Sequence, residues 1–312
     1  MNILLIAGGW SSERDVSLAG SKVVGQALKK LGHTVERYDP ATSLEGLMQA
    51  AKDKDFAFIA LHGSPGEDGL IQAMLERAGC PYQGAGPAAS MLALNKAASK
   101  VLFTEAGLNT APWLLLNSLP NAGWRPELGF PLFIKANTGG SSLHMERVSR
   151  PDDLFPALTR LFALGSSYLI ESAITGAEIT CGVLSELRGN QEVPVALPPI
   201  LIKPSTGSIF DYTCKYAPGG AEEICPAPIS AELTRKVQEM ALTAHRVLGI
   251  SGYSRADFIV PEDETPVLLE VNTLPGMTAT SLLPQEAAAY GLSFEGLIAR
   301  LIELGVAKGK ID

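Results

Sequence analysis

The chain has 312 residues and a formal net charge of −8. Because it has no excess of Lys and Arg to displace counterions from phosphates, a nucleic-acid-binding role is disfavoured. Hydrophobic residues make up 46% and charged residues 19% of the chain, which is typical of globular proteins, and the length predicts two or three packed lobes. No apolar run reaches the roughly 20 residues that span a bilayer, and the N-terminus lacks the basic segment of a signal peptide. We therefore expect a cytoplasmic protein with no membrane or nucleic-acid partner.

The four cysteines are scattered along the chain and form no C-x-x-C pair; they are Cys80, Cys181, Cys214 and Cys225. Structural zinc sites and disulfide frameworks usually show closely spaced or regularly spaced cysteines. Reduced, partly buried thiols are therefore the expected state of all four.

The first ninety residues alternate strand and helix patterns. Strands are predicted at residues 2–7, 34–38 and 56–61, and helices at 16–31 and 70–78. This βαβ order predicts a parallel sheet, in which ligands bind beyond the C-terminal ends of the strands. Two loops at such ends carry Glu13 and His62. Each could bind an amine or move a proton, or could be an ordinary capping or hydrogen-bonding residue.

A helix is predicted at residues 88–107, and the predicted elements after it are mostly short strands. Short strands are predicted at 132–135, 145–148, 168–171 and 179–184, with a helix near 152–164. Residues 191–228 are rich in Pro and Gly and show little regular pattern, which predicts a long functional loop. A helix at 231–248, strands at 253–260 and 267–271, and helices near 281–289 and 293–304 complete the chain.

The hairpin formed by the last two strands gathers polar side chains. If its six-residue turn is symmetric, Val260 pairs with Val267, Asp257 lies opposite Glu270, and Arg255 lies opposite Asn272. Residues two apart in a strand share a face, and two opposed carboxylates repel each other. A hard divalent cation offsets that repulsion, and Asp, Glu and Asn oxygens are its natural ligands. The alternative is a solvated polar face on which Arg255 neutralises one carboxylate.

Two glycine-containing segments could bind anions. Residues 273–282 lead from the hairpin into a helix start, whose free N–H groups could hold a carboxylate or an oxyanion; ordinary capping by Thr280 or Ser281 is the alternative. Residues 135–142 (KANTGGSS) could bring backbone N–H groups and Lys135 to a phosphate, or form a simple hairpin turn. They do not match the P-loop motif. Residues 84–89 match G-x-G-x-x-[GA] but do not follow the first strand, so dinucleotide binding is disfavoured and Pro87 at a helix start explains them.

Taken together, these segments resemble the D-alanine–D-alanine ligase family of the ATP-grasp superfamily. Residues 8–18 (GGWSSERDVSL) are similar to the family's opening signature, GG-x-S-x-E-R-E-V-S-L. Residues 62–69 (HGSPGEDG) resemble its H-G-x-x-G-E-D-G motif, and residues 269–278 (LEVNTLPGMT) resemble its closing signature. The resemblance runs from the first strand to near the C-terminus.

The resemblance implies an α/β protein with the ATP-grasp fold in three lobes. These are an N-terminal parallel βαβ lobe at residues 1–90, a small central α+β lobe at 91–175 and a C-terminal α+β lobe at 176–312. ATP would bind between the central and C-terminal lobes. The family is typically a homodimer through its N-terminal lobe, so a homodimer is expected here too.

The resemblance also implies roles for single residues. Glu13 would hold the ammonium group of the first D-alanine with His62 nearby, and Ser281 and Leu282 would bind the carboxylate of the second. The expected ATP-binding residues are Lys96, Lys135, Ser142, Glu171, Ser172, Ala173, Ile174, Glu178 and Lys215, with 171–174 as the adenine hinge and Glu178 near the ribose. Two Mg²⁺ ions, or Mn²⁺ in their place, would be held by Asp257, Glu270 and Asn272. The expected catalytic residues are Glu13, Ser141, Tyr216, Arg255 and Gly276, with Ser141 and Tyr216 linking to Glu13 when the loop at 211–218 closes.

The implied reaction is the ATP-dependent ligation of two D-alanines through a D-alanyl phosphate, for peptidoglycan precursor synthesis. Positioning, charge neutralisation and the exclusion of water are then the tasks of the protein. The chain departs from the family at Ala136, where many members have Pro, and at His144, where a small residue is usual. Tyr216 resembles members that form D-alanyl-D-alanine and argues against D-lactate. A related ligase that uses D-serine, D-lactate or another amino acid remains the alternative, and a non-catalytic nucleotide-binding protein is disfavoured because Arg255 and the metal ligands are all present.

Overall fold

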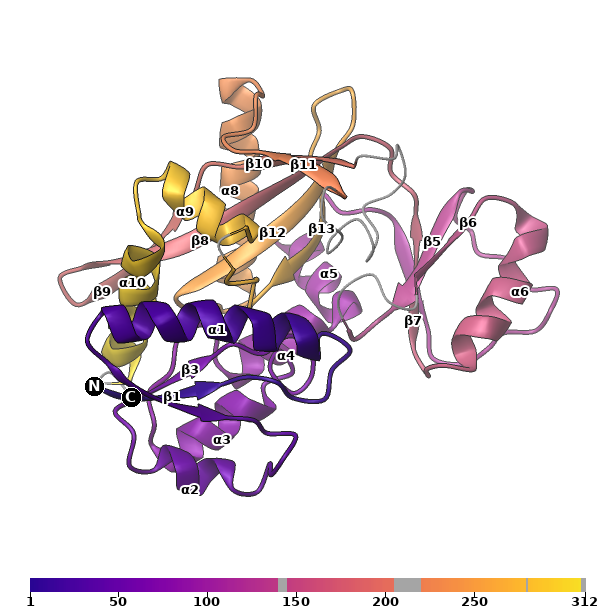
Figure 1. The fold of residues 1–312 in the computed structure, drawn as a ribbon. Coiled ribbons are helices and arrows are strands. Elements are labelled where there is room, and N and C mark those ends of the chain that lie inside the picture. Colours follow the sequence, from indigo (N-terminus) through magenta and orange to yellow (C-terminus); the bar gives the residue numbers. More distant parts are fainter. Residues whose placement is uncertain (140–144, 205–219, 279, 310–312) are drawn as a thin grey trace.

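The computed structural model describes residues 1–139, 145–204, 220–278 and 280–309, which form three sheets (Figure 1). The first sheet is parallel, with the order β2-β1-β3. Its strands are β1 (Asn2–Ile6), β2 (Thr34–Tyr38) and β3 (Phe56–Ile59), and the helices of this part are α1 (Arg14–Lys30), α2 (Leu47–Ala51) and α3 (Leu70–Ala78). The predicted βαβ pattern with a parallel sheet is confirmed. The apolar strands β1 and β3 are buried and need cover on both faces.

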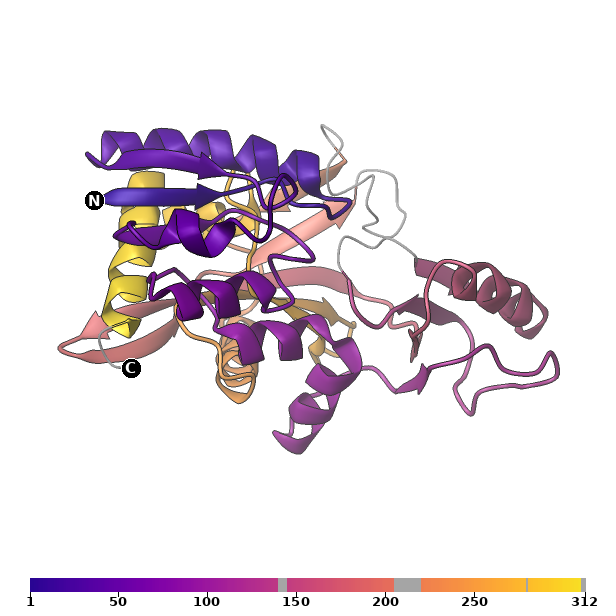
Figure 2. The same cartoon turned by 90° about the horizontal axis from the view of Figure 1, so that it is seen from below.

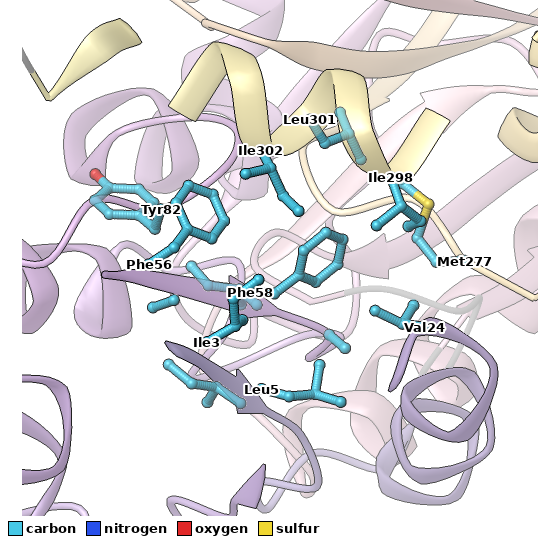
Figure 3. Packing of buried hydrophobic residues seen from close by; sticks show 14 of the residues in the cluster. Ile3, Leu5, Val24, Phe56, Phe58, Tyr82, Met277, Ile298, Leu301 and Ile302 are labelled. Carbon is cyan, nitrogen blue, oxygen red and sulfur yellow. The ribbon is translucent and has the colours of Figure 1, made fainter. Parts of the chain in front are cut away.

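The cover on one face of this sheet comes from the far end of the chain. Helices α9 (Leu282–Ala289) and α10 (Phe294–Lys308) follow the last strand, and α10 packs against α1 and β3. Figure 3 shows Ile298, Leu301 and Ile302 of α10 against Phe56 and Phe58 of β3. The N-terminal sheet and the C-terminal helices therefore share one hydrophobic core.

The second sheet is antiparallel, with the order β4-β7-β5-β6. It comprises β4 (Trp113–Leu116), β5 (Leu132–Ala136), β6 (Met145–Val148) and β7 (Tyr168–Ser172), and helix α6 (Pro151–Phe162) covers it. Figures 1 and 2 show β5, β6, β7 and α6 set apart from the rest of the molecule in both views.

The third sheet has the order β11-β10-β8-β12-β13, and β9 pairs with β8. Its strands are β8 (Ala177–Arg188), β9 (Gln191–Ala196), β10 (Ile200–Pro204), β11 (Ala221–Ile224), β12 (Tyr253–Val260) and β13 (Val267–Asn272). One face packs on α4 (Pro87–Leu94), α5 (Lys96–Glu105) and α8 (Ala231–Val247). This arrangement of three sheets, with a small α+β part in the middle of the chain, agrees with the predicted ATP-grasp architecture.

Three local predictions were wrong. The helix predicted at residues 88–107 is two helices, because Asn95 leaves the helical conformation at φ −84° and ψ 97° and caps α5 through its side chain, which accepts from Ala98 N–H. The predicted loop at 191–228 contains β9, β10 and β11. Pairing with β8 turns β9 and β10 into strands, and pairing with β10 does the same for β11. Such pairing is a long-range property that local Pro and Gly content does not reveal. Finally, α2 and β4 were not predicted.

Three findings within the described part of the chain concern membrane spans, cysteines and Pro87. No helix there is long and apolar enough to cross a membrane. Cys80, Cys181 and Cys225 are free thiols, while Cys214 lies outside the described residues. Pro87 stands at the first turn of α4, as predicted for the 84–89 motif.

Candidate active site

One face of the third sheet collects the polar residues that the sequence singled out. Gly182 on β8 lies opposite Arg255 on β12, which in turn lies opposite Asn272 on β13. Two residues further along β12, Asp257 lies between Thr180 and Glu270 in the same way. Directly paired residues point to the same side of a sheet. Because the other face is filled by the core beneath α8, this face is the one open to ligands.

The register of the β12–β13 hairpin was predicted correctly at its functional end and wrongly at its turn. Asp257 pairs with Glu270 and Arg255 with Asn272, but Val267 pairs with Ile259 rather than with Val260. A β-bulge between Asp257 and Phe258 absorbs the difference. A bulge places one extra residue in one strand and so resets which side chains share a face.

Asp257 is bound from three sides. The Arg255 guanidinium donates to both carboxylate oxygens at 2.9 and 2.8 Å, Asn272 Nδ2 donates at 3.0 Å, and the Thr180 hydroxyl donates at 2.7 Å. Burial lowers the pKa of Arg255, but the carboxylate of Asp257 outweighs it and raises that pKa above its ordinary value. In this state Arg255 neutralises Asp257, which is the alternative arrangement that the sequence left open.

The donor set of this face also suits a hard cation. Asp257 and Glu270 supply carboxylate oxygens from facing strand positions, and Asn272 bonds to Asp257 through its Nδ2, which leaves the amide oxygen on the other side of the group. Among the described residues, no group of three or more His, Cys, Asp and Glu side chains is placed to hold a metal ion. Two carboxylates and one amide oxygen nevertheless suit Mg²⁺, which usually shares its coordination shell with phosphates and water.

Positive charge lies beside these ligands. Lys96 Nζ is 3.5 Å from Glu270 Oε2 and donates to the Gly139 carbonyl at 2.6 Å. The backbone of Lys96 donates to Asn137 O at 2.9 Å, which ties the start of α5 to the beginning of the predicted glycine-rich loop. Lys96 therefore joins β13 to the segment that was expected to bind phosphate.

Glu171 on β7 is buried between two lysines. Its side chain is 3% exposed and forms ion pairs with Lys100 and Lys135. Burial raises the pKa of Glu171, but the two ammonium groups outweigh burial and hold that pKa below its ordinary value. For Lys135, burial lowers the pKa while Glu171 and Glu270 raise it, and the net pKa is raised. Glu171 is therefore ionised and Lys135 protonated at neutral pH.

The segment after Glu171 was predicted to be the adenine hinge. Ser172 N–H donates to Pro112 O at 3.0 Å, and Ala173 N–H donates to Pro131 O at 3.0 Å. Ile174 N–H has no backbone bond of this kind within the described ranges. Glu178 follows on β8, half-buried, two residues from Thr180 on the ligand face.

The start of helix α9 is open. Ser281 occupies the N-cap position, but its side chain forms no capping bond with the helix. The Ser281 hydroxyl instead accepts from Thr278 N–H at 3.0 Å. A Cβ added at Gly276 would lie 2.7 Å from Ser281 Oγ, so these two positions adjoin. The capping alternative is therefore wrong for Ser281, and no side chain of the described residues caps the first N–H groups of α9, including that of Leu282.

Glu13 and His62 come together at the edge of the parallel sheet. Ser11 Oγ donates to His62 O at 2.6 Å and accepts from Glu13 N–H at 3.2 Å. His62 Nδ1 is 3.9 Å from Glu67 Oε1, and a Cβ at Gly63 would lie 3.5 Å from Glu13 Oε2. The loops that carry the first two motifs thus meet, as parallel-strand ends should.

Four predicted site residues, Ser141, Ser142, Lys215 and Tyr216, lie outside the described residues, as does His144. Three residues that the sequence did not single out border the site. Thr180 binds Asp257, and Lys100 binds Glu171. The sequence signal for Lys100 was its position four residues after Lys96, which places both lysines on the same helix face.

The third missed residue is Glu286 on α9, which is fully buried. Its Oε1 accepts from Gly182 N–H at 2.8 Å, and its Oε2 has no hydrogen-bond partner among the described residues. Burial is the main cause that raises the pKa of Glu286 to about 8; Gly182 N–H and Arg255 offset it in part. The sequence signal that could have identified Glu286 is that it is the one charged residue in α9.

The comparisons with known proteins agree with this geometry. The family model described as the D-ala D-ala ligase C-terminus matches residues 102–303, and the one described as the D-ala D-ala ligase N-terminus matches residues 36–85. A D-alanine–D-alanine ligase of Nitratidesulfovibrio vulgaris is 61% identical over 306 residues, which cover 98% of each chain.

Two solved structures share the whole fold. The D-alanine–D-alanine ligase of Bacillus anthracis complexed with ATP has a TM-score of 0.86 at 33% identity, covering 100% of this chain and 99% of the other. A D-Ala:D-Ser ligase of Enterococcus faecalis has a TM-score of 0.82 at 28% identity, covering 97% and 99%. With its sheet order, its ligand face and these matches, the chain belongs to the D-alanine–D-alanine ligase family and has the ATP-grasp fold.

Proposed function

We propose that this protein ligates two D-alanines to D-alanyl-D-alanine with ATP and Mg²⁺, as a step of peptidoglycan precursor synthesis. The observation that carries the proposal is the ligand face on β8, β12 and β13. It places Arg255 and two carboxylates side by side, with Lys96 3.5 Å from Glu270. The relatives at high identity share that named activity.

The chemistry requires activation of a carboxylate. Its oxygen attacks the γ-phosphorus of ATP, the bond to ADP breaks, and a D-alanyl phosphate forms. The amine of the second D-alanine, having lost a proton, attacks the carbonyl carbon; the C–N bond forms, the C–O bond to phosphate breaks, and phosphate leaves. Most of the protein's task is to position the reactants and neutralise charge.

Each part of the described site has a place in that scheme. We assign Asp257, Glu270 and Asn272 to two Mg²⁺ ions, for which Mn²⁺ can substitute; the metal offsets charge on the phosphates. The Asp257 carboxylate accepts four hydrogen bonds, from Arg255, Asn272 and Thr180, so metal binding requires at least one of these donors to leave it. Arg255, once released, can then bind the transferring phosphate, and Gly276 N–H the tetrahedral oxyanion.

We assign the nucleotide and amino-acid subsites from the family resemblance, supported by the contacts of those residues that the structure describes. The phosphates of ATP are assigned to Lys96, Lys135, Ser142 and Lys215. Adenine is assigned to Glu171, Ser172, Ala173 and the N–H of Ile174, and the ribose to Glu178. Glu13 and His62 are assigned to the first D-alanine. The open N-terminus of α9, with Ser281 and Leu282, is assigned to the carboxylate of the second. Ser141 and Tyr216 are proposed to link to Glu13 on closure.

The experiment that tests the proposal measures phosphate release and dipeptide formation by the purified chain with ATP and Mg²⁺. D-Alanine alone is expected to give one phosphate per dipeptide, and L-alanine none. The Arg255→Ala variant, purified in the same way, controls for contaminating ATPases. Turnover that appears only after D-serine or D-lactate is added would favour a ligase with another second substrate, and no turnover with D-alanine would refute the proposal.

The assembly and the cellular site are part of the same proposal. We infer three lobes, at residues 1–90, 91–175 and 176–312, and a cytoplasmic homodimer formed through the first of them. The support is the family resemblance. Sedimentation velocity is expected to give a single species of twice the chain mass of 32.9 kDa, and a monomer at micromolar concentration would refute the dimer.

A further inference from the structure

Lys100 on α5 is a charged residue with no exposed surface and no place in the scheme above. Its side chain is 0% exposed. A buried ammonium is unfavourable unless it is paired. Lys100 Nζ forms an ion pair with Glu171 Oε1 at 2.5 Å, and it also donates to Thr110 Oγ1. Burial lowers the pKa of Lys100, and Glu171 offsets part of that effect.

The Glu171 carboxylate is divided between two cations. Lys100 takes Oε1 and Lys135 takes Oε2. Two ammonium groups and one carboxylate leave one formal positive charge, which favours a phosphate nearby. Without Lys100, Glu171 and Lys135 would form a neutral one-to-one pair, and Lys135 could turn to a phosphate only by leaving a buried carboxylate alone.

The second contact of Lys100 leads to the metal-binding strand. Thr110 Oγ1 donates onward to Leu268 O at 3.0 Å, and Thr110 forms a parallel bridge with Leu268. Leu268 N–H in turn donates to Asn109 O at 2.9 Å. Leu268 stands two residues before Glu270 on β13. One buried ammonium therefore contacts the glutamate on β7 and, through one hydroxyl, the strand that carries Glu270.

We infer that Lys100 is a positioning residue for the nucleotide: it is the permanent counter-ion of Glu171, which frees Lys135 for a phosphate of ATP and keeps the Glu171 carboxylate in place to accept from the adenine amino group. This inference rests on the assignment of Glu171 and Lys135 to ATP made above. A purely structural role, in which Lys100 only fastens α5 to β7, is the competing interpretation.

The test uses Lys100→Met, which keeps the length of the side chain and removes its charge, and compares ATP with ITP. ITP carries a carbonyl where ATP carries the amino group, so an acceptor at Glu171 discriminates between them. We expect the KM for ATP to rise about tenfold or more, the KM for D-alanine to change less than about twofold, and the ATP-over-ITP preference in kcat/KM to fall about tenfold. Parallel changes for both nucleotides and D-alanine would show a structural role and overturn the inference.

Thr110→Val is the matched control. It removes the hydroxyl that joins Lys100 to Leu268 and leaves the Lys100–Glu171 ion pair intact. This variant is expected to keep its preference for ATP over ITP while losing some thermal stability. A loss of preference equal to that of Lys100→Met would mean that the preference depends on packing rather than on the ion pair, and would overturn the inference.

Glu171→Met, which removes both carboxylate oxygens and leaves no acceptor for the adenine amino group, separates the two levels of the argument. If this variant keeps the full ATP preference, the assignment of Glu171 to adenine fails. If it loses the preference and Lys100→Met does not, the assignment stands and the inference about Lys100 fails. In the double variant, removal of Lys100 is expected to cause no further loss of preference, since Lys100 acts through Glu171. If Lys100→Met alone does not fold, the comparison of the double variant with the Glu171 single variant still tests the inference. A further loss of ATP preference in the double variant would overturn it.

Discussion

Glu286 makes the stability of this protein depend on pH in a direction opposite to that of most carboxylates. Burial raises its pKa from the ordinary 4.5 to about 8. Between those values the folded protein keeps the proton that the unfolded chain has released. Stability therefore falls as pH rises through this window. Glu286→Gln keeps an oxygen to accept from Gly182 N–H but cannot ionise, so it removes the pH-dependent loss.

The size of the effect follows from the two pKa values. Relative to a group that stays neutral, Glu286 is expected to destabilise the fold by about 1 kcal/mol at pH 5, about 3 kcal/mol at pH 7 and about 5 kcal/mol at pH 9. At about 2 °C for each kcal/mol in a chain of this length, Glu286→Gln should raise Tm by about 2, 6 and 10 °C at those pH values.

Differential scanning calorimetry of both proteins at the three pH values measures this difference. Glu262→Gln, a change at an exposed turn residue, is the control for losing one carboxylate and should shift Tm by a constant small amount. A Glu286→Gln shift that does not grow between pH 5 and pH 9 would refute the reasoning, because it would mean that the buried group does not titrate in this window.

Three further predictions concern the metal, the packing of α9 and the acid limb of stability. Glu270→Gln should lower kcat by at least about 100-fold and raise the Mg²⁺ concentration needed for half-maximal turnover; phosphate release titrated with Mg²⁺ tests this, and unchanged kinetics would contradict the metal assignment. Gly182→Ala places a Cβ 2.6 Å from Leu283 Cδ1 and closer still to Glu286 Oε2, so it should destabilise by about 1–3 kcal/mol and raise the KM for D-alanine more than that for ATP. Burial lowers the pKa of His245 to about 4, so the unfolded chain takes up a proton first and stability is lost as pH falls from 6.5 to 4, by about 3 kcal/mol. His245→Gln should flatten that loss in urea unfolding at pH 4.5 and pH 7, and an equally steep loss would show that other groups cause it.

The hairpin illustrates how far sequence alone can reach. Alternation within each strand predicted that Arg255 and Asp257 share a face, as do Glu270 and Asn272. Their pairing across the hairpin was predicted from the assumed symmetric turn, and Asp257 does pair with Glu270 and Arg255 with Asn272. The turn end was misplaced by one residue. A β-bulge is set by how a strand fits its neighbours, here β12 between β8 and β13, and no local pattern encodes it.

By itself, the sequence determined the parallel βαβ pattern of the first ninety residues, the three signatures and the charged residues of the ligand face, because periodicity, turn residues and motif spacing are local properties. The tertiary structure alone decided which charges became buried. Lys100 lies in a helix whose sequence resembles a surface helix, yet Glu171 and Thr110 enclose it from other elements. Glu286 is buried because α9 folds back onto β8. Desolvation depends on every neighbour that excludes water, and those neighbours come from distant parts of the chain.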